Sequence, residues 1–185
     1  MATLIHLNGA PGVGKSTIAE RYAAEHPGVL NCDIDRLRCL VGGWRDDFGA
    51  VGAVIRPLAL AMIRAHLDGG RDVVLPQMLA REAEQDRFRA AAAEGGHAYV
   101  HVLLQAPPGE ASFRFYRRPV ADPLLEVIRG VVDADGGSAA IDDLDRRLAA
   151  TAGLREAICV DAGADVEGTY RRVLDALAAT TPSGR

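Results

Sequence analysis

Residues 9–16 are Gly9-Ala10-Pro11-Gly12-Val13-Gly14-Lys15-Ser16, and they fit the phosphate-loop pattern GxxxxGK[ST]. The preceding segment, 3–8, is short and apolar, as a buried strand would be. The following segment, from Lys15 to about Glu25, is typical of a helix. The pattern binds phosphate when it joins a strand to a helix in this order, so the sequence predicts a phosphate site here.

The residue types of this loop suit the chemistry of phosphate. Glycines let the backbone curl so that its N–H groups face phosphate oxygens, and the start of the next helix adds a positive dipole. We expect Lys15 to reach the β- and γ-phosphates, the Ser16 hydroxyl to bind Mg²⁺, and Thr17 to support the loop or pack. The predicted nucleotide-binding residues are Gly9, Ala10, Pro11, Gly12, Val13, Gly14, Lys15, Ser16 and Thr17.

The composition singles out the same loop. Lys15 is the only lysine among 21 basic residues, and it occupies the position where a compact ammonium is the usual phosphate ligand. The 185 residues are 49% hydrophobic and 25% charged, which fits one folded domain rather than a disordered chain. The net charge of −4 provides no overall basic field, so we expect no nucleic-acid partner.

Cysteine usage and hydropathy indicate a cellular compartment. Cys32, Cys39 and Cys159 form no CxxC pair, and a low, odd number of cysteines is typical of a reducing cytosol. We find neither an apolar run near the ~20 residues that span a bilayer nor a charged segment ahead of the first strand. These observations predict a cytoplasmic protein with no membrane partner.

Apolar segments alternate with amphipathic ones along the whole chain. Further strands are predicted at 29–32, 72–75, 97–105 and 157–160, and further helices at 33–41, 50–67, 80–94, 110–118, 141–152 and 166–179. We expect residues 119–140, which hold Pro119, Pro123 and two adjacent glycines, to be irregular, and 181–185 to be a flexible tail. The alternation predicts an α/β fold, a parallel sheet of about five strands covered on both faces, in a single domain over 1–180.

An acidic pair follows the second predicted strand, at the edge of the sheet where ligands bind. A carboxylate there can accept a proton from a substrate hydroxyl, and we assign this general-base role to Asp35. Asp33 either contacts substrate or caps the helix that starts beside it. Arg36 and Arg38 either bind an anionic substrate group or are solvated.

These segments carry a family resemblance. The chain resembles small P-loop kinases, chiefly the tunicamycin-resistance ATP-binding proteins and the chloramphenicol phosphotransferases, with zeta-toxin kinases more distant. The similarity lies in 7–16, in Asp35-Arg36-Leu37 where the chloramphenicol kinases carry a catalytic Asp, in 74–78, and in 141–161 with the last helix. The resemblance implies a P-loop NTPase fold, ATP, Mg²⁺ and transfer of the γ-phosphoryl group to the hydroxyl of a small molecule.

Small kinases of this kind supply cations from a lid, which the resemblance would place at about 114–140. Arg114 and Arg118 lie four residues apart on one predicted helix and are the candidates to neutralise the transferring phosphate, with Arg117 as a substitute for Arg118. Trp44 follows a Gly-Gly break and either stacks on substrate or plugs the core.

The third predicted strand departs from the pattern of many P-loop proteins. It ends in Leu75-Pro76-Gln77, where they place an aspartate that holds magnesium. Magnesium would then be bound by Ser16, the phosphates and water, with Asp33 or Asp35 as further candidates. Gln77 is either a substrate or water contact or a polar strand end.

The sequence thus predicts an ATP-dependent phosphotransferase for a small-molecule acceptor, such as an antibiotic or a nucleoside-like compound. Two alternatives remain open. One is a toxin-like kinase of nucleotide sugars, and the other is an ATP-binding resistance or switch protein that sequesters a ligand without turnover. The missing acid after the third strand keeps the latter open. The acceptor and the oligomeric state are not encoded in any recognisable motif.

Overall fold

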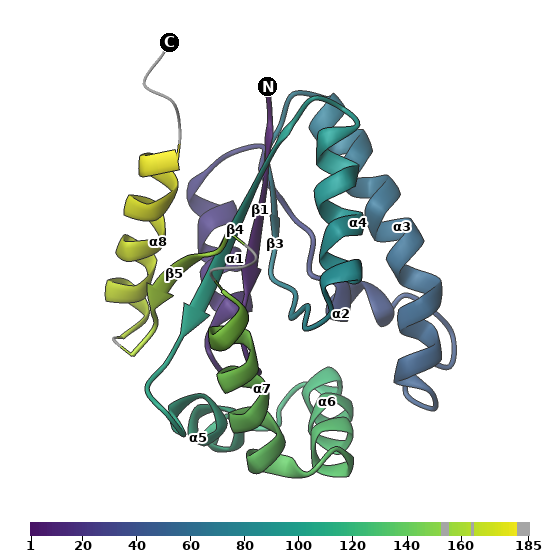
Figure 1. Cartoon of the computed structure of the whole chain (residues 1–185). Coiled ribbons are helices and arrows are strands. Elements are labelled where there is room, and N and C mark those ends of the chain that lie inside the picture. Colours follow the sequence, from purple (N-terminus) through teal and green to yellow (C-terminus); the bar gives the residue numbers. More distant parts are fainter. Residues whose placement is uncertain (153–155, 164, 181–185) are drawn as a thin grey trace.

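The computed structural model describes residues 1–152, 156–163 and 165–180 (Figure 1). Within them one parallel sheet has the strand order β2-β3-β1-β4-β5. The strands are β1 (Thr3–Asn8), β2 (Leu30–Asn31), β3 (Val73–Leu75), β4 (Ala98–Gln105) and β5 (Ile158–Asp161). The central strand β1 pairs His6 with Leu75 of β3 and with His101 of β4. The predicted α/β fold with a five-stranded parallel sheet is confirmed.

Helices cover both faces of the sheet. They are α1 (Lys15–Glu25), α2 (Ile34–Arg38), α3 (Phe48–Asp68), α4 (Glu82–Ala93), α5 (Glu110–Arg117), α6 (Pro123–Ala134), α7 (Gly137–Thr151) and α8 (Val166–Thr180). Ile63 of α3 and Phe88 of α4 are buried in the core on one face, while Ile18 of α1 and Tyr170 of α8 are buried on the other. Helices α5, α6 and α7 gather beyond the carboxyl ends of the strands (Figure 1). Residues of all three helices line a cleft at this edge of the sheet, together with the phosphate loop.

The prediction that 119–140 is irregular was wrong. Helix α6 fills most of this stretch, and α7 begins at Gly137, four residues before the predicted start at Ile141. Pro123 does not break a helix here, because it occupies the first turn of α6, where a missing N–H is no loss. The Asp122 side chain caps the same helix by accepting a hydrogen bond from the Leu124 N–H at 3.0 Å.

Helix α3 corrects a second expectation. By length and composition alone, this 21-residue helix is apolar enough to cross a membrane, although we predicted no such segment. Such a signal is weak, because core helices also show it. In the fold, Ile55, Ala59, Ile63 and Leu67 form a buried stripe on α3 that packs against the sheet and α4.

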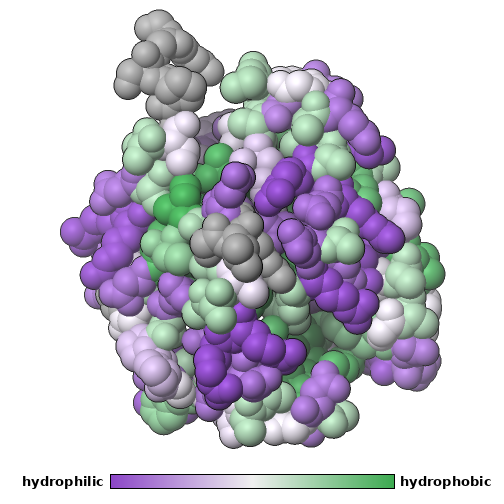
Figure 2. All heavy atoms as spheres, viewed as in Figure 1, coloured by the Kyte–Doolittle hydropathy of each residue, from purple (hydrophilic) through white to green (hydrophobic). Residues whose placement is uncertain are grey.

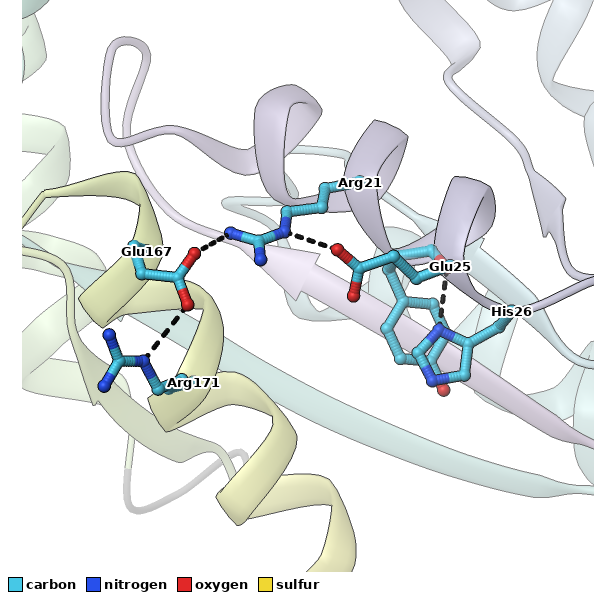
Figure 3. A network of polar contacts seen from close by, with 6 residues as sticks. Arg21, Glu25, His26, Glu167 and Arg171 are labelled. Atoms are coloured by element: carbon cyan, nitrogen blue, oxygen red, sulfur yellow. Dashed lines mark hydrogen bonds and ion pairs between the residues drawn. The ribbon is translucent and has the colours of Figure 1, made fainter.

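A surface network ties the last helix to the helix of the phosphate loop (Figure 3). Arg21 of α1 pairs with Glu25 at 2.8 Å and with Glu167 of α8 at 2.6 Å, and Glu167 also binds Arg171 at 3.1 Å. The Arg21 guanidinium lies 4.2 Å from the centre of the Tyr170 ring. Exposed ion pairs contribute little individually, so this network adds only modestly to the contact between α1 and α8.

Gly12 offers a test of how tightly the phosphate loop packs on α5. A Cβ at Gly12 would lie 2.1 Å from the Ala111 carbonyl oxygen and 2.9 Å from the Phe115 Cβ, whereas a Cβ at Gly14 would meet nothing within 4 Å. Both glycines have positive φ, at +88° and +106°, so both substitutions share the backbone strain. We expect Gly12→Ala to lower the free energy of unfolding by about 2 kcal/mol more than Gly14→Ala. Urea denaturation followed by circular dichroism measures the difference, and equal losses would contradict the packing.

Candidate active site

The phosphate loop has the backbone conformation that its glycines permit. Gly9, Gly12 and Gly14 have φ values of +141°, +88° and +106°, and α1 begins immediately afterwards at Lys15. This curvature turns the loop around the start of the helix, where unpaired N–H groups and the helix dipole favour an anion. The predicted phosphate site therefore has the strand, loop and helix that it needs.

Asn8 anchors the start of the loop. Its fully buried side chain accepts hydrogen bonds from the Gly9 N–H at 2.8 Å and from the Leu79 N–H at 3.1 Å, and donates one to the Leu79 carbonyl at 3.2 Å. The amide thus joins the loop to the segment that follows β3. The sequence gives no signal of this role, because Asn8 is simply the last residue of the predicted strand.

The Lys15 amine reaches across the loop. Its Nζ donates hydrogen bonds to the carbonyl oxygens of Gly9 at 2.7 Å and Ala10 at 3.0 Å. Burial lowers the pKa of Lys15 to about 8, although the charges of Asp35 and Asp33 oppose the shift. The amine is therefore held over the loop, and near pH 8 only about half of it is protonated. A bound phosphate would stabilise the protonated form.

A cleft of about 1260 Å³ opens beside the phosphate loop. On the face shown in Figure 2, a hollow with hydrophobic surface lies between α4 and α6. The cleft brings together most of the predicted site residues, namely the loop from Pro11 to Thr17, Asp33, Asp35, Arg36, Gln77, Arg114 and Arg118. Trp44 is not among the lining residues, and its ring instead lies 5.1 Å from the Arg45 guanidinium.

The two aspartates have different local roles. The Asp33 Oδ1 caps α2 by accepting hydrogen bonds from the N–H groups of Asp35 at 3.1 Å and Arg36 at 3.3 Å. Asp35 is not used in that cap, and its Oδ1 lies 3.5 Å from the Nε of Arg38. Burial raises the pKa of Asp35, and Arg38 and Lys15 hold the increase down. A carboxylate with a raised pKa is better suited to accept a proton than an ordinary surface aspartate.

Arg38 is a buried partner of Asp35 that the sequence left undecided between an anion ligand and a solvated side chain. Only 7% of the residue is exposed; its Nη1 donates to the Phe48 carbonyl at 2.8 Å, and its guanidinium lies 4.0 Å from the Phe48 ring centre. Gly52 leaves room for it, since a Cβ there would lie 3.0 Å from the guanidinium carbon. Arg38 is therefore placed to position Asp35, and the i,i+3 spacing of the two residues was the available signal.

The other predicted arginines have distinct partners. Arg36 is largely exposed and pairs with Asp122 at 3.1 Å and Glu20 at 3.7 Å. Arg114 pairs with Glu110 at 2.8 Å and donates to the carbonyls of Ala162 at 2.7 Å and Gly163 at 3.2 Å. These carbonyls belong to the loop after β5. Arg118 lines the cleft without a side-chain hydrogen bond or ion pair to any other described residue.

The resemblance to small P-loop kinases implies magnesium, which binds oxygen ligands. Among the described residues, no group of three or more His, Cys, Asp or Glu side chains is placed to hold a metal ion. The Ser16 side chain, Asp33 and Asp35 do line the same cleft. Hydroxyl and carboxylate oxygens around a phosphate loop suit an ion that keeps several waters and binds mainly to phosphates, so the residues present fit Mg²⁺ in that form.

Comparisons with known proteins agree with this geometry. The model of a family described as an AAA domain matches residues 4–135, which include the phosphate loop, Asp35 and the lid arginines. The chain belongs to this family. The predicted resemblance to small P-loop kinases is thereby confirmed, and membership implies ATP as the nucleotide. A search of the curated proteins finds no match.

Three solved structures share the fold over nearly the whole chain. A gluconokinase from Sinorhizobium meliloti 1021 is 20% identical with a TM-score of 0.64, covering 96% of this chain and 92% of its own. The tunicamycin resistance protein of Deinococcus radiodurans is 19% identical with a TM-score of 0.61 and 96% coverage of both chains. A deoxyadenosine kinase from M. mycoides is 12% identical with a TM-score of 0.54, covering 95% and 98%. At these identities the likeness shows the fold.

The lowered pKa of Lys15 predicts how nucleotide affinity depends on pH. Only the protonated amine attracts phosphate, and with a pKa of about 8 in the free protein most of it is neutral at pH 9. We expect ATP to bind about tenfold more weakly at pH 9 than at pH 7, with uptake of about one proton at the higher pH. Titration calorimetry in buffers of different ionisation enthalpy measures both.

The matched control is Lys15→Arg, whose guanidinium does not titrate in this range. This variant should bind ATP with an affinity that is nearly constant from pH 7 to 9. Equal proton uptake by the variant and the parent would assign the titration to another group and contradict the role given to Lys15.

Proposed function

We propose that the protein is a Mg·ATP-dependent phosphotransferase that moves the γ-phosphoryl group to a hydroxyl of a small molecule. The observation that carries the proposal is the placement of Asp35, a carboxylate with a raised pKa, in the same cleft as the phosphate loop. Nucleotide phosphates on the loop and a hydroxyl at Asp35 would then share one enclosed space.

The residues divide the work of transfer. Asp35 accepts the proton of the acceptor hydroxyl as the bond from that oxygen to the γ-phosphorus forms and the bond to the departing ADP breaks. Lys15 and Arg118 neutralise charge that builds on the transferring group, and Arg38 holds the Asp35 carboxylate in place. Magnesium, bound through Ser16 and the phosphates, would supply further positive charge at the phosphate oxygens.

Arg114 was predicted to neutralise the transferring phosphate, but its hydrogen-bond partners favour a structural role. Its guanidinium is bound to the carbonyls of Ala162 and Gly163 and to Glu110, so its donors are largely committed. We propose that it braces the loop after β5 against α5. Gln77 remains a candidate for the acceptor side, whereas Trp44 lies outside the cleft lining and Arg36 is paired with Asp122 and Glu20.

The names of similar structures support the reaction class without fixing the acceptor. A gluconokinase and a deoxyadenosine kinase share this fold, and so does a tunicamycin resistance protein. The acceptor classes to test are therefore hydroxylated antibiotics, nucleosides, sugars and nucleotide sugars. We place the reaction in the cytoplasm, where ATP is available.

Sequestration of a ligand without turnover is the second candidate function. It is favoured by the end of β3, where Pro76 and Gln77 line the cleft and no acidic residue follows the strand directly. Mass spectrometry separates the two candidates, because transfer yields a phosphorylated acceptor and sequestration yields none.

Asp35→Asn tests the mechanism directly. The amide cannot accept the proton, so we expect the transfer rate to fall by a factor of about 10²–10⁴. The variant should still bind ATP, because the phosphate loop is intact. Transfer is measured by incubating the protein with Mg·ATP and the acceptor panel and quantifying phosphorylated product by mass spectrometry.

Asp46→Asn is the matched control. Asp46 is exposed and does not line the cleft, so this variant should transfer phosphate at the parent rate. Full transfer by Asp35→Asn would remove Asp35 from the general-base role. Binding of ATP and an acceptor by the parent protein with no phosphorylated product would favour sequestration.

A further inference from the structure

Several arginines of the cleft are already occupied by protein groups. Arg36 pairs with Asp122 and Glu20, and Arg38 with Asp35 and the Phe48 carbonyl. Arg114 is bound to Glu110 and to the loop after β5. The two residues that the sequence suggested for an anionic substrate group, Arg36 and Arg38, are therefore poorly placed to bind one.

Two arginines outside every recognised motif remain on the acceptor side of the cleft. Arg56 projects from α3 and pairs loosely with Glu84 of α4, at 3.6 Å with 35% of its side chain exposed. Arg81 directly precedes α4 and lines the same cleft. Its guanidinium makes no hydrogen bond or ion pair with any other residue in the described parts of the chain. A long, partly solvated pair beside an uncommitted cation can exchange its partner for a ligand anion.

Arg56 and Arg81 differ from Arg38 in the carboxylates beside them. Arg38 is paired with Asp35, and Asp33 lines the same cleft while it caps α2. Arg56 and Arg81 line the cleft with Glu84, whose carboxylate is 3.6 Å from Arg56, and Glu82 in the first turn of α4 is not among the lining residues. These two arginines come from α3 and the start of α4, the helices that pack on the β3 side of the sheet.

Gln77 gives an independent indication of a ligand in the same place. It follows β3, lines the cleft and is only 8% exposed, yet its buried Oε1 has no hydrogen-bond partner among the described residues. Leaving a buried amide oxygen unpaired costs about 1–3 kcal/mol, so native sites usually have a group that pairs with it. A rotation of the Gln77 side chain that brings this oxygen to the cleft surface would let an O–H group of a hydroxylated ligand supply the missing donor.

We propose that the acceptor is a hydroxylated anion whose carboxylate or phosphate is bound by Arg56 and Arg81 while one of its hydroxyl groups donates to Gln77. This proposal rests on the proposed function, since it describes the acceptor of that reaction. The reacting hydroxyl lies at Asp35, between the anion site and the phosphate loop. Arg56 and Arg81 would then orient the acceptor with its charged end away from the phosphates of ATP.

Binding of matched compounds tests the proposal without requiring turnover. Each pair differs by one anionic group, with D-gluconate against D-glucitol as the carboxylate arm and glucose 6-phosphate against glucose as the phosphate arm. Titration calorimetry is carried out on the full chain saturated with Mg²⁺ and a non-hydrolysable ATP analogue. We expect the anionic member of at least one pair to bind about tenfold tighter or more than its neutral partner.

Three variants show which arginines cause the preference for anionic compounds. Arg81→Gln and Arg56→Gln should each reduce it to about threefold or less, and Arg87→Gln, an exposed position on α4 outside the cleft, should retain it. Unchanged affinity for the ATP analogue shows that each variant is folded. The proposal is overturned when no anionic compound binds tighter than its neutral partner, or when the preference survives in both Arg56→Gln and Arg81→Gln.

The outcomes of this experiment distinguish a failure of the anion site from a failure of the proposed transfer reaction. An anion preference that depends on Arg56 or Arg81, with no phosphorylated product from any acceptor, would overturn phosphoryl transfer and keep the binding site. Phosphorylation of neutral acceptors with no preference for anions would keep the transfer reaction and overturn the anion site.

Discussion

The close approach of the phosphate loop to α5 is the constraint on which the site depends. At Gly12 there is no space for a single methyl group, since a Cβ would lie 2.1 Å from the Ala111 carbonyl oxygen. Because α5 carries Arg114 and leads into Arg118, this contact fixes the arginine-bearing helix relative to the loop that would hold the phosphates. Asn8 makes the corresponding connection on the other side, from the loop to the segment after β3. Gly12 therefore serves the packing of the loop on α5 as well as its curvature.

Burial acts on both titratable groups of the cleft and shifts their pKa values toward one another. It lowers the pKa of Lys15 to about 8 and raises the pKa of Asp35, while their mutual attraction opposes both shifts. An anionic nucleotide would favour the charged amine and raise the pKa of Asp35 further, because like charges repel. Arg38 counteracts this repulsion and, in the proposed mechanism, would keep the carboxylate available as a base. A buried arginine beside the acid is thus a consequence of placing a base near phosphates.

Local patterns predicted the features that depend on short spacings. The phosphate loop, the order of strands and helices, and the placement of Asp35 after β2 all follow from residues close together in the chain. Helix α6 was missed because Pro123 was treated as a breaker, although Asp122 and Pro123 together form a helix start. The convergence of Arg38, Arg56 and Gln77 comes from three different elements, and no sequence spacing encodes it. Trp44 shows the converse, since a lone aromatic residue in a loop does not say which side it faces.

The missed helix also changes the character of the cleft. Leu125, Ile128 and Val131 of α6 line the wall opposite the polar groups of α2, α3 and α4. An apolar wall offers no hydrogen bonds to water, so an acceptor held between the two walls would displace solvent from the region around Asp35. Excluding water strengthens the attraction of Lys15 and the arginines for phosphate oxygens, and it limits hydrolysis as a competing reaction. In the proposed reaction, α6 would therefore help to decide whether phosphate passes to an acceptor or to water.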